Sequence, residues 1–179
     1  MSATTVVAEI LVVGLQAEVW VALLILALHD GASLAGLAEH LKGMKEWATL
    51  GTTVVLGMAY GLGVIVDRWA DTLLFWQDRD QPHDTGVMRL TVMDKSERMA
   101  RFLDYQRSRL RVVRGTVVNV LLITVSAALY CVTRRSGAGL GWVLVAGILA
   151  LIATGFAATR IKKAFFDRLG EAYKIAKAA

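Results

Sequence analysis

Two carboxylates four residues apart, Asp67 and Asp71, end the second long apolar segment of this 179-residue chain and share one face of a helix. If several copies of the chain assemble around an axis, such carboxylates form an acidic ring, and acidic rings select cations. The alternative is a structural role, in which the neighbouring Arg68 forms an ion pair with Glu9 near the same membrane surface.

Three polar residues interrupt the first apolar segment, and charged groups in hydrocarbon are costly enough to require a protein or water partner. Glu9 and Gln16 are seven residues apart and share a face, whereas Glu18 points roughly the opposite way from Glu9. Gln16 and Glu18 fall near the middle of the membrane, where neither surface is within reach. They predict either a pore-lining or proton-linked site, or hydrogen bonds between helices with Glu18 protonated or paired.

Four arginines crowd the start of the third apolar segment: Arg107, Arg109, Arg111 and Arg114. Arginines in this position are typical of anchors that bind the phosphate groups of anionic lipids. A phosphate-bearing regulator is the alternative ligand. The polar residues Asn119, Thr124 and Ser126, further along the segment, predict hydrogen bonds between helices.

The signatures of common enzyme classes are absent from the sequence, which has no G-x-x-x-x-G-K-[ST], H-E-x-x-H, C-x-x-C or G-x-S-x-G. A single cysteine, Cys131, excludes a disulfide framework, and three scattered histidines make a zinc site unfavourable. Carboxylates without a neighbouring nucleophile or open metal site are not a hydrolase signature. We therefore expect no enzymatic activity, no catalytic residue, no metal and no cofactor.

The composition places the chain among integral membrane proteins. Hydrophobic residues make up 56% of it, charged residues 20%, and the mean hydropathy is +0.53. Because a transmembrane helix needs about 20 apolar residues, the sequence predicts an all-α protein with four spans. These are residues 6–28, 48–67 (continuing as a helix to Trp76), 112–132 and 140–159.

The basic residues predict the orientation. The loop between the second and third spans and the C-terminal tail together carry 15 Lys and Arg residues, whereas the other two loops carry 4. The richer side is cytoplasmic by the positive-inside rule, so both termini are expected in the cytoplasm of a bacterium, with the spans in its inner membrane. The net charge of +5 then needs no nucleic-acid partner.

Three regions follow along the chain. Residues 1–76 form a first hairpin, whose outer loop 31–47 has the apolar spacing of an amphipathic helix in the membrane interface. Residues 77–94 form a cytoplasmic loop with a turn around Pro82, an alternation over 87–93 typical of an extended segment, and Asp94 as a helix cap. Residues 95–179 form a second hairpin with cytoplasmic extensions.

The extensions are predicted from missing helix breakers. No glycine or proline lies between Lys95 and Arg114, which predicts one helix over about 95–133, roughly 58 Å long. The fourth span likewise continues through residues 160–177. The two helices are expected to pack as a cytoplasmic stalk, with one set of apolar residues against another: Met99, Phe102, Leu103 and Leu110 against Phe165, Leu169 and Tyr173.

Small residues indicate close helix packing in two spans. Gly57 and Gly61 form a GxxxG motif in the second span. In the fourth span, small residues recur every four positions, at Ala146, Ala150, Thr154 and Ala158. Four helices leave much apolar surface uncovered, so we expect a homo-oligomer.

The part of the chain from Asp94 to the C-terminus has the order helix, span, short turn, span and helix. In this outline it resembles the two-span effector modules (SLATT type) of bacterial defence systems. The resemblance covers about half of the chain and includes no motif residue. It implies pore formation, and the additional first hairpin departs from it.

Together these features predict a homo-oligomeric bacterial channel or pore that conducts cations and is gated from the cytoplasmic side. Gln16, Glu18, Asp67 and Asp71 are the residues expected along the ion pathway. The alternatives are a scaffold or sensor subunit that transports nothing, and a small proton-coupled transporter that uses Glu18. Expected partners are the anionic lipid bilayer, further copies of the chain, and a cytoplasmic protein or small-molecule regulator.

Overall fold

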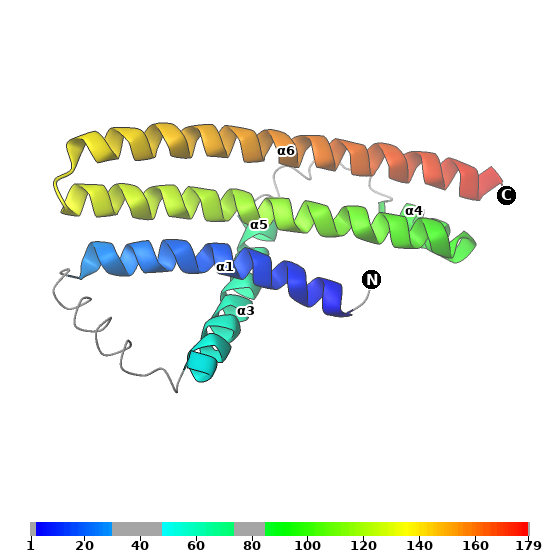
Figure 1. Cartoon of the computed structure of the whole chain (residues 1–179). Coiled ribbons are helices and arrows are strands. Elements are labelled where there is room, and N and C mark those ends of the chain that lie inside the picture. The colour runs from blue at the N-terminus through cyan, green and yellow to red at the C-terminus, as the bar shows by residue number, and fades with distance from the viewer. Residues whose placement is uncertain (1–2, 30–47, 74–84, 179) are drawn as a thin grey trace.

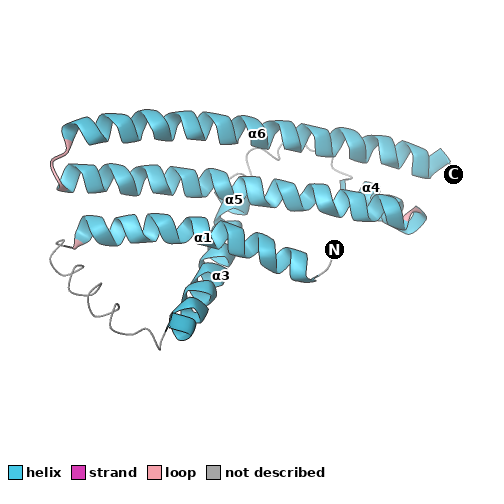
Figure 2. Cartoon of the chain, viewed as in Figure 1, coloured by secondary structure: helices cyan, strands magenta, loops and turns pink. Residues whose placement is uncertain are grey.

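A computed structural model describes residues 3–29, 48–73 and 85–178, and these residues form helices and short turns, without a strand (Figure 2). The helices are α1 (Ala3–Leu28), α3 (Ala48–Leu73), α4 (Thr85–Lys95), α5 (Glu97–Thr133) and α6 (Gly137–Ala178). The predicted all-α class is therefore confirmed. The predicted amphipathic helix at 31–47 and the turn around Pro82 lie outside the described residues.

Four of these helices, α1, α3, α5 and α6, are long and apolar enough to cross a membrane. This number of candidate helices among the described residues matches the four predicted spans and supports a membrane-spanning protein. Helix α3 begins at Ala48, as predicted for the second span, and continues to Leu73.

Helices α1, α5 and α6 lie side by side, and α3 crosses α1 and reaches α5 (Figure 1). Helices α5 and α6 are antiparallel and joined by a turn at residues 134–136. Helix α1 runs beside α5 in the same direction, and the guanidinium of Arg134 donates a hydrogen bond to the carbonyl oxygen of His29 over 3.1 Å. Helix α3 crosses α1 obliquely.

Helices α5 and α6 are much longer than a membrane requires. Their 37 and 42 residues correspond to about 56 and 63 Å, against a hydrocarbon core of about 30 Å. The long helices predicted from the absence of breakers are confirmed. We call α4, residues 97–111 of α5 and residues 160–178 of α6 the helical extension.

The residue that caps the start of α5 differs from the prediction. Ser96 is the N-cap, and its hydroxyl oxygen accepts a hydrogen bond from the backbone N–H of Met99 over 3.4 Å. Asp94, the predicted cap, lies instead in the last turn of α4. A serine three residues before Met99 caps in the same way as an aspartate.

The prediction of an extended segment at 87–93 is wrong, because α4 covers it as a helix. Met88 and Val92 are four residues apart, and both pack against the apolar cluster of the extension. Their spacing places them on one helical face. A short apolar run cannot distinguish a strand from a helix by its period alone.

An apolar core holds the extension together. Its buried residues come from three helices: Val92, Leu103, Phe165, Leu169, Ala172 and Ala176. Met99 and Tyr173 pack at its edge, as predicted. Phe102 lies instead under the guanidinium of Arg168, 5.2 Å from the ring centre.

A second core lies between the spans, formed by Val13, Ala17, Val66, Ala70 and Val118. Helices α1 and α3 approach closely at Gly14, where an added Cβ would lie 1.6 Å from the carbonyl oxygen of Ala59, and at Gly63. The GxxxG residues Gly57 and Gly61 have no described atom near the position of an added Cβ. Within one subunit, α3 therefore packs through a face other than its GxxxG face.

Helix α6 packs on α5 along part of its predicted small-residue stripe. Ala158 is buried, Ala150 and Thr154 are partly buried, and Ala146 is exposed. An added Cβ at Gly147 would lie 2.3 Å from a methyl carbon of Thr124. Only 6% of the most apolar stretch of α6 is buried in the subunit.

Candidate functional site

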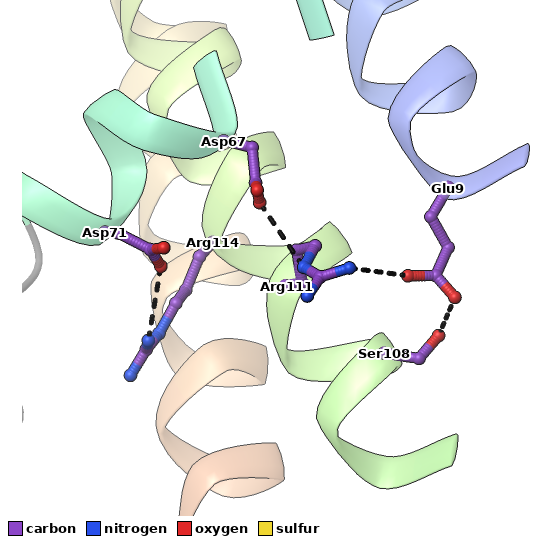
Figure 3. A network of polar contacts seen from close by, with 6 residues as sticks. All are labelled: Glu9, Asp67, Asp71, Ser108, Arg111 and Arg114. Atoms are coloured by element: carbon purple, nitrogen blue, oxygen red, sulfur yellow. Dashed lines mark hydrogen bonds and ion pairs between the residues drawn. The ribbon is translucent and has the colours of Figure 1, made fainter. Parts of the chain in front are cut away.

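Five charged residues and a serine meet at one place, where α5 passes from its apolar half into the extension (Figure 3). Helices α1, α3 and α5 each contribute to it. We call this group the charged junction; its members are Glu9, Asp67, Asp71, Ser108, Arg111 and Arg114.

Arg111 is the centre of the charged junction, because carboxylates from two helices share its guanidinium. One nitrogen lies 3.7 Å from Oε2 of Glu9 on α1, and Nε lies 3.6 Å from Oδ1 of Asp67 on α3. These distances are ion-pair contacts and exceed those of hydrogen bonds. One cation on α5 thus attracts both α1 and α3.

Glu9 is buried, with 8% of its surface exposed. The hydroxyl of Ser108 donates a short hydrogen bond to Oε1, while Arg111 supplies the opposite charge. A buried carboxylate needs such partners, since an uncompensated charge in the interior is strongly destabilising.

The predicted ion pair between Glu9 and Arg68 is replaced in the structure. The cation beside Glu9 is Arg111, and Arg68 is exposed. Helix α1 packs against both α3 and α5. Arg68 is exposed on α3, so the arginine beside Glu9 is the one that α5 supplies.

A second ion pair joins α3 to α5. The guanidinium of Arg114 lies 3.8 Å from Oδ1 of Asp71. The Arg114 side chain is 13% exposed and that of Asp71 is 57% exposed, so this pair lies at the rim of the junction. Asp67 and Asp71 are thus brought together, as their spacing predicts, and each faces an arginine of its own chain.

The four arginines predicted as lipid anchors divide into two groups. Arg111 and Arg114 belong to the charged junction, whereas Arg107 and Arg109 are exposed. The guanidinium of Arg109 lies over the ring of Tyr105, 5.9 Å from its centre. The anchor role stays a prediction for the exposed pair.

The sequence reasoning missed Ser108 and the inward direction of Arg111. One signal was available: Ser108, Arg111, Gly115 and Asn119 recur at helical spacing along α5. Small and polar residues at this spacing mark the face that α1 covers, where an added Cβ at Gly115 would contact Val13. Arginine on that face requires an acid on the covering helix.

A separate polar cluster lies deeper between the spans, around Asn119. Its amide nitrogen donates to the carbonyl oxygen of Val13 over 2.8 Å and to Oε1 of Gln16 over 3.4 Å. The indole of Trp20 donates to Oδ1 of Asn119 over 3.2 Å, and the hydroxyl of Thr116 donates to Gln16 over 3.1 Å. Gln16 therefore forms hydrogen bonds between α1 and α5.

Glu18 joins neither group. It is partly buried, and among the described residues its Oε1 is a buried oxygen without a hydrogen-bond donor. Of the predicted pathway residues, Glu18 is thus the one whose carboxylate stands apart from the polar contacts of the bundle.

The described residues contain no group of three or more His, Cys, Asp or Glu that could hold a metal ion. No protein-family model, curated protein or solved structure matches the chain. In the part of the chain that the structure describes, fold and site therefore define a helical protein with four helices long and apolar enough to span a membrane and an arginine–carboxylate junction between three of them.

Proposed function

We propose that the chain forms a homo-oligomeric pore of the bacterial inner membrane, which conducts cations and is gated from the cytoplasmic side. In this proposal the charged junction is a latch that holds α1 and α3 against α5 in the closed state. The helical extension lies in the cytoplasm and moves α5 and α6 when it receives a signal.

The observation that carries this proposal is the position of Arg111. It contacts Glu9 and Asp67 on two different helices at the base of the extension. Because α5 and α6 continue without interruption from the extension into the spans, a displacement of the extension moves Arg111 relative to both acids. Such coupling through rigid helices is a common basis of gating.

The same latch gives the aspartates a role in selectivity. In the closed state Arg111 and Arg114 balance the charges of Asp67 and Asp71. When α5 moves away, the two carboxylates become available at the inner mouth, where acidic rings favour cations.

Assembly from several copies is supported by the apolar surface that one subunit leaves uncovered. The most apolar stretches of α3 and α6 are 17% and 6% buried. The GxxxG motif of α3 is open within the subunit, and such motifs are typical contacts between membrane helices.

Ion flux into liposomes tests the latch. We expect wild-type protein to leak potassium slowly and Arg111→Gln to leak faster, by a factor of about 5 to 150, the range of typical coupling energies. Arg109→Gln is the matched control, because it removes the same charge two residues earlier from an exposed position. Circular dichroism establishes that each variant is helical.

Two results would contradict the proposal. One is the same slow flux from folded wild-type protein, from Arg111→Gln and from empty liposomes. The other is a monomeric mass in nanodiscs that persists at every protein concentration.

Cation selectivity is tested by Asp67→Asn with Asp71→Asn, which should lower the ratio of potassium to chloride flux.

A scaffold or sensor subunit that transports nothing is the second candidate. It is favoured by the polar contacts within the subunit, since Gln16, Glu9 and Asp67 all face partners in the same chain. This candidate predicts a protein partner that co-purifies in fixed ratio, binds through the extension, and is accompanied by no ion flux.

A further inference from the structure

A pocket of about 280 Å³ lies beside the charged junction, between α3, α4, α5 and α6. Four arginines line it, Arg89 from α4 and Arg107, Arg111 and Arg114 from α5, together with Asp71. Phe165 and Phe166 of α6 form an apolar wall. Nothing in the proposed pore function requires this pocket.

The lining of the pocket carries four positive charges and one negative charge. Glu9, Asp67 and Asp104, which pair with two of these arginines, are not among the lining residues. Arg89 is hydrogen-bonded to Asp104 over 2.7 Å, so its charge is balanced. Arg111 lies 3.6 Å or more from the carboxylates of Glu9 and Asp67, too far for hydrogen bonds with those acids. Arg107 adds a further charge and lies within electrostatic range of both Arg89 and Arg111. Cations placed this close repel one another, and an anion between them would relieve the repulsion.

We propose that this pocket binds a phosphate group, carried either by the head group of an anionic phospholipid or by a small phosphate compound in solution. Guanidinium groups recognise phosphate through paired N–H donors, which makes arginine the preferred residue for this anion. A pocket of this size lies below the range of about 300–1,000 Å³ typical of drug-sized ligands, so it suits a single head group.

Two further features fit this ligand. Helix α4 begins at Thr85, and its first two residues line the pocket beside the arginines; the first turn of a helix carries a partial positive charge. The pocket also lies at the level where the apolar part of α5 ends, just before Gly115.

Two probes applied to the full-length protein separate the sources of phosphate. For the lipid, the protein is placed in nanodiscs of equal parts phosphatidylcholine and phosphatidylglycerol, and native mass spectrometry counts the lipids that remain bound after release. For the soluble compound, inorganic phosphate and glycerol 3-phosphate are titrated calorimetrically onto protein in phosphatidylcholine nanodiscs. Chloride at equal ionic strength is the reference.

We expect wild-type protein to bind at least one probe, and Arg107→Gln and Arg89→Gln to bind it about tenfold more weakly, the effect of losing one charge-assisted hydrogen bond. Lys163→Gln should stay within about twofold of wild type, because Lys163 is exposed, lies outside the pocket lining and is not one of the predicted lipid anchors. Retention of phosphatidylglycerol alone assigns the site to lipid, and binding of a soluble probe assigns it to a free phosphate compound.

The proposal is overturned if folded wild-type protein prefers neither probe over phosphatidylcholine and chloride. It is also overturned if Lys163→Gln weakens binding as much as Arg107→Gln, since the attraction would then belong to the basic surface in general. Neither result depends on ion flux, so the phosphate-binding proposal is tested independently of the proposed pore function.

Discussion

Glu9 and Asp67 lie on different helices, yet they share the guanidinium of Arg111. Each acid alone would be costly near the hydrocarbon, and the shared cation lowers that cost for both. Asn119 has the corresponding role among uncharged groups, because it is fully buried and hydrogen-bonded to α1. The polar residues of the spans thus specify which helices meet.

At the residue scale, Gly14 provides the clearest test of packing. An added Cβ would lie 1.6 Å from the carbonyl oxygen of Ala59 and 3.0 Å from its Cα, and backbone atoms cannot move aside cheaply. We expect Gly14→Ala to lower the free energy of unfolding by about 1–3 kcal/mol, the usual cost of overpacking. Thermal unfolding in detergent, followed by tryptophan fluorescence, measures the change.

The matched control for this prediction is Gly51→Ala on α3, where no described atom lies within 4 Å of the added Cβ and which lies outside the GxxxG motif. Alanine has the higher helix propensity, by up to about 1 kcal/mol, so this variant should be as stable as wild type or slightly more so. Equal destabilisation by both variants would show that the α1–α3 crossing does not depend on close approach at Gly14.

At the element scale, the extension is a three-helix unit with its own core, separate from the core of the spans. Its two long helices were predictable, because unbroken runs without glycine or proline leave one continuous helix as the simplest outcome. Helix α4 was not predictable, because the apolar spacing over 87–93 fits both a strand and a helix. Only the packing of Met88 and Val92 in the core of the extension distinguishes the two.

Leu169 tests whether the extension folds as a unit. It is 2% exposed in the core shared by α4, α5 and α6, and Leu169→Ala should cost about 2–5 kcal/mol through the cavity it leaves. We expect amide hydrogen exchange in α4 and residues 97–105 to become faster by about 30-fold or more. Residues 112–133 should keep their protection.

Ile175→Ala is the control for this experiment, because Ile175 lies on the same helix and is 65% exposed. Its exchange pattern should match that of wild type within error. Faster exchange along the whole of α5 in Leu169→Ala would instead mean that extension and spans unfold together, which would weaken the case for a separate signalling unit.

At the scale of the whole molecule, the sequence was sufficient for the number of spans and insufficient for their arrangement. Hydrophobicity identifies α1, α3, α5 and α6, because each is long and apolar regardless of its neighbours. Which helices pack together depends on how their side chains fit. Glu9 pairs with Arg111 because α1 lies along α5. No count of residue types contains that information.

The orientation of the whole molecule is a prediction that cysteine labelling can test. With Cys131→Ala as background, Ser136→Cys places a thiol in the turn between α5 and α6, and Lys177→Cys places one near the C-terminus; both positions are exposed. The loop and the tail at the other ends of these helices, away from that turn, carry 15 of the basic residues. The positive-inside rule therefore puts the turn outside and the C-terminus in the cytoplasm.

A membrane-impermeant maleimide should label Ser136→Cys in intact cells and Lys177→Cys only after permeabilisation, with Cys131→Ala as the unlabelled control. The reverse pattern would place the extension, and with it the phosphate pocket, on the outer face, and a gate operated from the cytoplasm would then be ruled out.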